Sequence, residues 1–298
     1  MKDYVAENER ILNEWREKYV KENQQKYPKC SNLGDYFAND GIMYKGEIRG
    51  AYKYYENEEC KFSWIRLPGG RENILWANTP IRVLFLTKDQ NTNDDTAWDV
   101  RNETFWAADE SITPKERRID TSRFNSNLVY ILFGILNTTS DRLMGYSEFT
   151  DKEALNFVDN QIFARINCKK EVGEDKCPNN ILKKAIDNDK RYLKEQILNL
   201  DADILVCCGH QNEENIILNT VYDIYKNEFE YVNFFEDKGT GIHYNAKRNI
   251  LAIDAYHLSH LNGGSEARYN ETVGMYYEFL KYLKKTKGID FSNSHRLE

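Results

Sequence analysis

The fold of this chain is decided by residues 81–91, which read Ile81-Arg82-Val83-Leu84-Phe85-Leu86 and then Thr87-Lys88-Asp89-Gln90-Asn91. A short, nearly continuous apolar run is typical of a strand buried on both faces, and the polar residues after it indicate a loop. Apolar runs predict further strands at residues 162–166, 204–208, 231–235 and 250–254, and helical spacing predicts helices at about residues 3–25, 125–136, 179–200, 213–222 and 269–285. Strands that alternate with helices predict an α/β fold of three layers, with helices on both faces of a mainly parallel central sheet.

The first eighty residues follow a different pattern. An amphipathic helix is expected at about residues 3–25, but residues 29–79 are irregular, rich in aromatic side chains and interrupted by Pro68-Gly69-Gly70. We therefore expect residues 1–79 to be a helical and irregular N-terminal elaboration packed on the core. Residues 80–290 form the α/β domain in this interpretation, and residues 291–298 form a tail that ends in Leu297-Glu298, a pair typical of an expression vector.

Composition excludes several classes of protein. With 41 basic and 48 acidic residues the formal net charge is −7, so the overall field repels polyanions and any nucleic-acid contact needs a local basic surface. The longest apolar run, residues 128–136, is far shorter than the roughly 20 residues of a membrane-spanning helix. The first residues also lack the apolar stretch of a signal peptide. A cytoplasmic protein without membrane contact is expected.

The six cysteines do not form a recognisable metal or disulfide pattern. None belongs to a CxxC pair, and six in nearly three hundred residues are too sparse for a disulfide scaffold. The adjacent Cys207 and Cys208 fall in a predicted strand, where small buried thiols are expected. The sequence therefore predicts neither a metal site nor a cofactor.

Polar residues gather after the predicted strands. In open parallel sheets, ligands bind beyond the carboxyl ends of the strands, so these loops are the place to look for chemistry. The loops contain Lys88 and Asp89 after the first core strand, Asn167, Lys169 and Lys170 after the second, His210 after the third, and His257, Ser259 and His260 after the last.

The order of these motifs resembles the uracil-DNA glycosylase superfamily over roughly residues 81–285. Asp89 lies where that family has Gly-Gln-Asp-Pro-Tyr, Asn167 matches its base-reading asparagine, and a later strand ends in Gly209. Residues 257–261, His257-Leu258-Ser259-His260-Leu261, lie where the family has His-Pro-Ser-Pro-Leu. The three prolines and the glycine of these two family motifs are replaced here, and this changes the stiffness of the loops.

The resemblance implies a DNA glycosylase-like hydrolase that cleaves the N-glycosidic bond of a flipped uracil-like or modified pyrimidine, without a metal or cofactor. It implies that Asp89 orients water and stabilises positive charge on the sugar, that His257 donates to the departing base, and that Asn167 reads the base edge. The remaining expected roles are base stacking by Trp98, Phe105 or Trp106, insertion of Leu261 into the duplex, and DNA contacts by Lys88, Lys169, Lys170, Ser259 and Ser265.

Ordinary structural roles are open for each of these residues. Asp89 and Asn167 are residue types that are common in turns. His257 can be a loop histidine whose hydrogen bonds are made within the protein, and Leu261 can pack in the core. A catalytically inactive nucleic-acid-binding module on the same fold is the main alternative function. A nucleotide-binding regulator is a third, but the chain has no GxGxxG or GxxxxGK phosphate loop.

Overall fold

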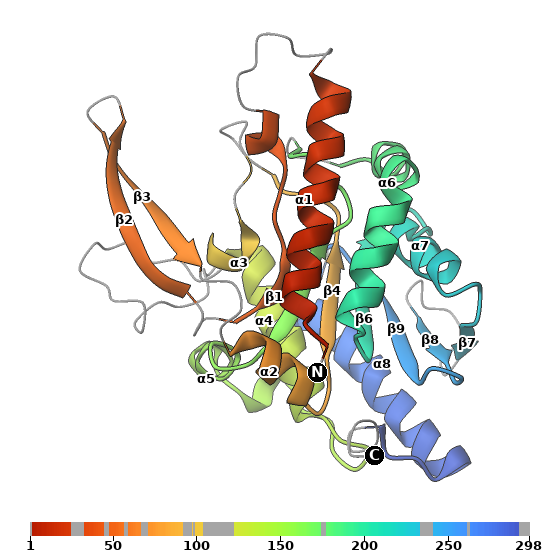
Figure 1. Cartoon of the computed structure of the whole chain (residues 1–298). Coiled ribbons are helices and arrows are strands. Elements are labelled where there is room, and N and C mark those ends of the chain that lie inside the picture. Colours follow the sequence, from red (N-terminus) through yellow and green to blue (C-terminus); the bar gives the residue numbers. More distant parts are fainter. Residues whose placement is uncertain are drawn as a thin grey trace.

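A computed structural model describes residues 2–24, 33–44, 48–56, 59–66, 71–91, 97, 99–103, 122–173, 177–232, 241–260 and 263–291, with the backbone alone for residues 48–56, 59–66 and 102–103. One seven-stranded sheet organises these residues, in the order β1-β5-β4-β6-β9-β8-β7 (Figure 1). Its strands are β1 (Gly41–Met43), β4 (Val83–Thr87), β5 (Phe163–Asn167), β6 (Ile204–His210), β7 (Glu230–Val232), β8 (Ile242–Asn245) and β9 (Ile250–Tyr256). The central strands β5, β4, β6 and β9 are parallel, whereas β1, β8 and β7 are antiparallel additions at the edges.

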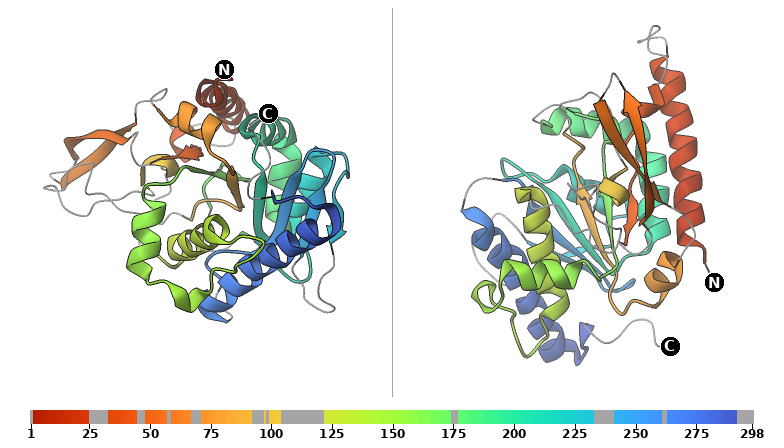
Figure 2. Two further views of the ribbon diagram at one scale, coloured as in Figure 1. Left: turned by 90° about the horizontal axis from the view of Figure 1, so that it is seen from below. Right: turned by 90° about the vertical axis from the view of Figure 1, so that its left-hand side faces the viewer.

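Helices cover both faces of this sheet, which confirms the predicted three-layer α/β fold (Figure 2). One face carries α1 (Tyr4–Asn23), α2 (Glu72–Asn78), α6 (Asn179–Leu200) and α7 (Ile216–Ile224). The other carries α4 (Arg123–Asn137), α5 (Asp151–Val158) and α8 (Gly264–Lys287). Short helical segments occur at α3 (Val100–Glu103), η1 (Leu33–Tyr36) and η3 (Tyr146–Glu148).

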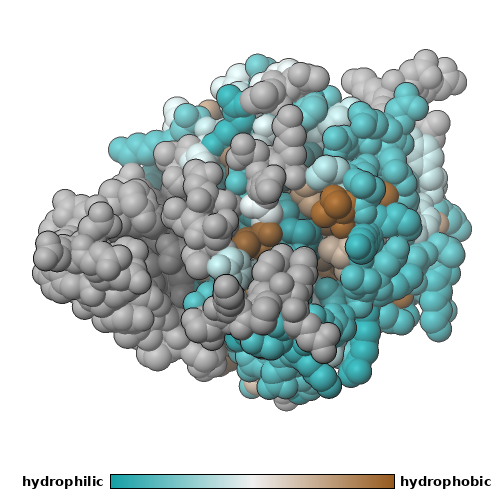
Figure 3. All heavy atoms as spheres, turned by 90° about the horizontal axis from the view of Figure 1, so that it is seen from above, coloured by the Kyte–Doolittle hydropathy of each residue, from teal (hydrophilic) through white to brown (hydrophobic). Residues whose placement is uncertain are grey.

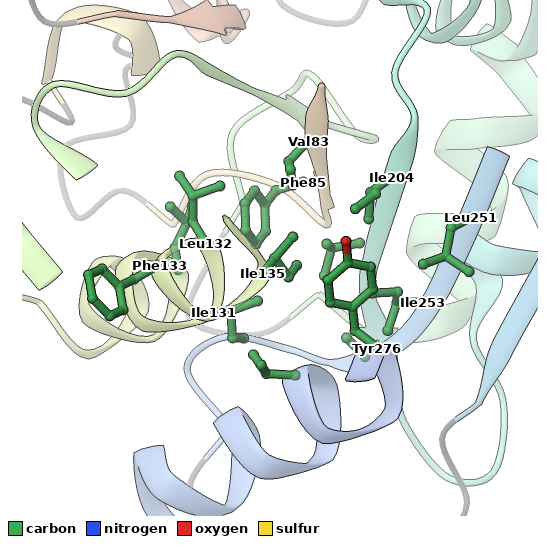
Figure 4. Packing of buried hydrophobic residues seen from close by; sticks show 14 of the residues in the cluster. Val83, Phe85, Ile131, Leu132, Phe133, Ile135, Ile204, Leu251, Ile253 and Tyr276 are labelled. Carbon is green, nitrogen blue, oxygen red and sulfur yellow. The ribbon is translucent and has the colours of Figure 1, made fainter. Parts of the chain in front are cut away.

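Four of the five residues of β4 are apolar, which follows from its position at the centre of the sheet. All five of its residues are buried, and successive side chains alternate between the two faces. Phe85 packs with α4 and α8, whereas Leu84 and Leu86 pack with α1 and α6. Figure 4 shows side chains from β4, β6, β9, α4 and α8 filling the space between the sheet and one helix layer. Burial on both faces is therefore the reason that residues 83–86 have no alternating polar positions.

The N-terminal region is integrated into the sheet and one helix layer. Helix α1 packs along α6, β1 pairs with β5, and Trp76 of α2 is fully buried with its indole nitrogen 2.9 Å from the carbonyl oxygen of Leu200. Strands β2 (Ile48–Glu56) and β3 (Glu59–Arg66) form a separate two-stranded ribbon that projects from the body (Figure 1). The irregular pattern of residues 29–79 does not predict β1, β2, β3 or α2, because a three-residue strand and a seven-residue helix are too short to show a period.

The connections between the central strands create a switch in chain direction. The chain leaves β4 through α4 on one face to reach β5, and it leaves β5 through α6 on the opposite face to reach β6 on the other side of β4. Crevices at such points are the usual ligand sites of open α/β sheets. No helix in the described ranges combines the length and apolarity needed to cross a membrane.

Candidate functional site

The carboxyl edge of the central strands brings together residues from distant parts of the sequence. Backbone hydrogen bonds also join the segments at the ends of β4 and β5, since Cys168 N donates to Thr87 O at 2.8 Å and Lys169 N donates to Lys88 O at 2.8 Å. Figure 3 views this edge from above and shows small apolar patches surrounded by polar surface. The loops after β4, β5, β6 and β9 thus border one region of the molecule.

Asp89 is held by an ion pair within this region. Its Oδ2 lies 3.2 Å from Lys169 Nζ, which also donates to the carbonyl oxygens of Glu171 at 2.7 Å and Val172 at 3.1 Å. Burial raises the pKa of Asp89, and the adjacent Lys169 ammonium opposes that rise. All three ammonium hydrogens of Lys169 are engaged, so Lys169 positions the carboxylate and has no donor left for a phosphate.

Gly173 allows the chain to fold closely over Asp89. Its amide donates to Gln90 O at 2.8 Å, and a Cβ at position 173 would clash with Oδ2 of Asp89. The segment after β5 therefore covers one side of the carboxylate. Nothing in the sequence marks this glycine, because its role depends on a residue more than eighty positions earlier.

Lys88 connects the loops that follow β4 and β6. Its Nζ lies 2.9 Å from Gln211 Oε1 and 3.2 Å from Cys177 O. Burial lowers the pKa of Lys88. A third neutral acceptor, Asn179 Oδ1, lies 3.5 Å from Nζ, and only 6% of Lys88 is exposed, so the ammonium is bound within the protein and does not lie on the surface as predicted.

Asn167 ends β5 with an unpaired amide hydrogen-bond donor. Its side chain is fully buried, and Oδ1 accepts a hydrogen bond from Thr87 Oγ1 at 2.6 Å. The Nδ2 atom has no hydrogen-bond partner among the described residues. Because a buried, unpaired amide donor is costly, this atom is a candidate for binding a ligand acceptor.

His257 follows β9 as a neutral imidazole. Its Nδ1 accepts from Ser259 N at 3.3 Å, so the remaining hydrogen lies on Nε2. Burial lowers the pKa of His257 to about 4, and the positive charges of Lys88 and Arg165 lower it further. Its ring packs against Phe124 of α4 with the centroids 5.7 Å apart. Phe124 was not among the predicted stacking residues, although an aromatic residue beside the predicted start of a helix was the signal that could have identified it.

Half-buried histidines with lowered pKa values make the protein sensitive to acid. Burial lowers the pKa of His243 in β8 to about 4, well below the value of about 6.5 for an unfolded chain. Between these values the unfolded state binds more protons, so the free energy of unfolding falls as the pH is lowered. Between pH 7 and pH 5 we expect the free energy of unfolding, measured in urea, to fall by about 2 kcal/mol less in His243→Gln than in the wild type. An equal loss in both proteins would contradict a depressed pKa.

A second group of polar side chains lies at the ends of β6 and β9. His210 Nδ1 lies 3.0 Å from Asp254 Oδ2, and Asn215 Nδ2 donates to Asp254 Oδ1 at 2.6 Å. Burial raises the pKa of Asp254, which these two contacts oppose. Tyr256 packs edge-on against His210 and is stacked on His260 at 5.1 Å. Asp254 is not among the residues predicted for the site, although an aspartate inside the otherwise apolar strand β9 is a signal of a functional position.

A small cavity adjoins both groups. It measures about 10 Å³, which is room for about one water molecule. Its lining consists of Ile131, Asp254, Ala255, Tyr256, His257, Leu258, Arg268, Glu271 and Thr272.

Lys170 is not on the surface of the edge. It is buried, and its Nζ lies 2.6 and 2.5 Å from the two carboxylate oxygens of Asp40. Ser259 is exposed near His257, and Ser265 is half-buried in the first turn of α8. Four predicted residues, Trp98, Phe105, Trp106 and Leu261, lie outside the described residues. The adjacent Cys207 and Cys208 are buried thiols, as predicted.

The described side chains include no cluster of three or more His, Cys, Asp or Glu residues that could hold a metal ion. No protein-family profile, curated protein or solved structure matches the chain.

Proposed function

We propose that the carboxyl edge of β5, β4, β6 and β9 is the active site of a DNA glycosylase-like hydrolase acting on a flipped uracil-like or modified pyrimidine. The observation that carries this proposal is the position of Asn167. Its amide is turned by Thr87 so that Nδ2 is an unpaired buried donor, at the same sheet edge as a neutral imidazole and a carboxylate. This set of groups suits a reaction that separates positive charge on a sugar from negative charge on a base.

Each group has a distinct task in the proposed reaction. The bond between C1′ and the base nitrogen breaks, and the electron pair leaves with the base. A water oxygen adds to C1′, and the proton that the water loses neutralises the departing base anion. His257 Nε2–H and Asn167 Nδ2–H donate to the base, where negative charge develops. Asp89 orients the water and stabilises the positive sugar, and Lys169 opposes the protonation of Asp89 that burial favours. Phe124 offers an aromatic face beside His257 for the extruded base.

The pairing of charges at the edge supports a second candidate function, that of a nucleic-acid-binding module without catalysis. Lys88, Lys169 and Lys170 are all buried and bonded to acceptors of the protein itself, so DNA contact by the predicted residues rests on the exposed Ser259 and the half-buried Ser265. Such a module would bind oligonucleotides and leave their bases attached.

Base release from defined oligonucleotides tests the proposal. Single- and double-stranded DNA carrying one uracil or 5-substituted uracil is incubated with the protein and heated in alkali, which breaks the strand at an abasic site. We expect breaks with the wild type and about 100-fold slower release with Asn167→Asp, because the donor toward the base becomes an acceptor.

The matched control is Asn160→Asp. Asn160 lies after α5, ahead of β5 and away from the carboxyl edge, and its side chain donates to Asn156 O at 2.8 Å on the surface. It should leave the release rate unchanged. Binding without breaks for every substrate would support the inactive module and overturn the glycosylase proposal.

A further inference from the structure

Arg165 in β5 is a buried guanidinium without a counter-ion among the described residues. Only 7% of the residue is exposed, and within the described part of the chain it forms no ion pair and no hydrogen bond, with Nε fully enclosed. Burial lowers the pKa of Arg165 to about 10, and Asp40 opposes this only at longer range because its carboxylate is bonded to Lys170. Buried charges in proteins are normally paired, so Arg165 is a marked exception.

Arg101 provides a direct comparison within the same protein. It is also buried, but its guanidinium contacts the carboxylates of Asp99 and Glu9. Burial alone would lower the pKa of Arg101, and these two carboxylates more than reverse that effect. Among the described residues, carboxylates therefore lie beside Arg101 but not beside Arg165.

The guanidinium of Arg165 points to the amino end of α4. Its central carbon lies 4.3 Å from the ring centroid of Phe124, the second residue of that helix. The helix has no acidic residue in its first turn, so no carboxylate of that turn neutralises the positive end of the helix dipole. An arginine and a helix amino terminus together form a recognised kind of anion site.

Two further hydrogen-bond donors lie near Arg165. Asn167 lies two residues after Arg165 on the same face of β5, and its Nδ2 is an unpaired donor. His257 is close enough for the charge of Arg165 to lower its pKa, and its free ring hydrogen is also a donor. A ligand here meets mainly donors and positive charge, and this favours an acceptor-rich, negatively charged group.

We propose that Arg165 and the amino end of α4 bind an oxyanion of the substrate, either a carboxylate substituent on the base or a phosphate of the nucleotide. The inference rests on the proposed function for the position of the base, but anion binding can be measured separately. It predicts that Arg165 is unpaired in the free protein because the ligand supplies its counter-ion.

Binding is tested by isothermal titration with uracil-5-carboxylate, uracil and inorganic phosphate. If the base carries the anion, uracil-5-carboxylate should bind about 10- to 100-fold more tightly than uracil, and Arg165→Met should abolish the difference. If the nucleotide phosphate is the ligand, inorganic phosphate should bind, Arg165→Met should remove that binding, and the two bases should be equivalent. Anion binding that is absent, or unchanged in Arg165→Met, would overturn the inference.

Thermal unfolding without ligand gives a second readout. Arg165→Met removes an unpaired buried charge, so we expect it to raise the Tm by a few degrees, whereas Arg101→Met leaves buried carboxylates unpaired and should lower it. A fall in Tm for both variants, with anion affinity intact, would make Arg165 structural.

The two proposals can fail independently. Release of uracil without any Arg165-dependent anion binding would overturn only the inference about Arg165. Anion binding that depends on Arg165, in a protein that releases no base from any oligonucleotide, would overturn the glycosylase proposal and support an anion site at this edge.

Discussion

Replacing Asp89 by asparagine is expected to slow base release by about 10²- to 10⁴-fold, the range lost when a positioned acid–base group is removed. Asparagine keeps the shape of the side chain but removes the negative charge that would stabilise the sugar and hold the water. In the wild type the Lys169 ammonium lies 3.2 Å from the Asp89 carboxylate, whereas in the variant it faces a neutral amide. The rate is measured as abasic sites formed in a single turnover on a uracil-containing oligonucleotide.

Two further variants separate catalysis from folding in this experiment. Asp203→Asn makes the same change in another partly buried carboxyl, which accepts a hydrogen bond from Arg82 N at 2.7 Å at the opposite end of the sheet, and release should not change. Gly173→Ala places a methyl group against Asp89 Oδ2 and should slow release by moving the carboxylate. If Asp89→Asn folds and releases base at the wild-type rate, Asp89 is not catalytic.

Replacing Lys170 by methionine is expected to lower the free energy of unfolding by about 3–5 kcal/mol, because it leaves a buried carboxylate unpaired. Asp40 is completely buried and accepts hydrogen bonds from Lys170 Nζ at 2.6 and 2.5 Å, from Gln196 Nε2 at 2.8 Å and from Asn167 N at 2.8 Å. It therefore connects α6 to the end of β5. Urea unfolding at pH 7 measures the loss.

An exposed ion pair is the control for this prediction. Lys183 and Asp187 lie 3.7 Å apart on the surface of α6, so Lys183→Met should change the free energy of unfolding by no more than about 1 kcal/mol. The double variant Lys170→Met/Asp40→Asn should recover part of the stability, since no unpaired charge is left. Equal, small effects of both lysine substitutions would show that the buried pair contributes little.

The position of the candidate site was predictable because it depends on strand order and loop position. Asp89, Asn167 and His257 each follow an apolar run, and parallel strands place their carboxyl ends at one edge. Phe124, Gly173 and Arg165 could not be assigned in the same way. Their roles come from contacts with residues far away in the chain, which no local spacing reports.

The sequence by itself determined the layered α/β architecture. The reason is that the spacing of apolar residues depends directly on which faces of an element are buried. A continuous run such as that in β4 indicates a strand covered on two faces, and helical spacing indicates a helix covered on one face. The predicted helix at residues 179–200 agrees with α6, and the predicted strands at residues 204–208 and 250–254 agree with the first parts of β6 and β9.

Only the tertiary structure decided which charges at the edge are neutralised. Lys169 and Lys170 are neighbours in sequence, yet one pairs with Asp89, 80 positions away, and the other with Asp40, 130 positions away. Arg165, four residues before Lys169, has no counter-ion within the described residues. Ion pairing depends on which distant segments fold together, because electrostatic energy depends on the distance between the charges and on their burial. Neither quantity can be read from the spacing of residues along the chain.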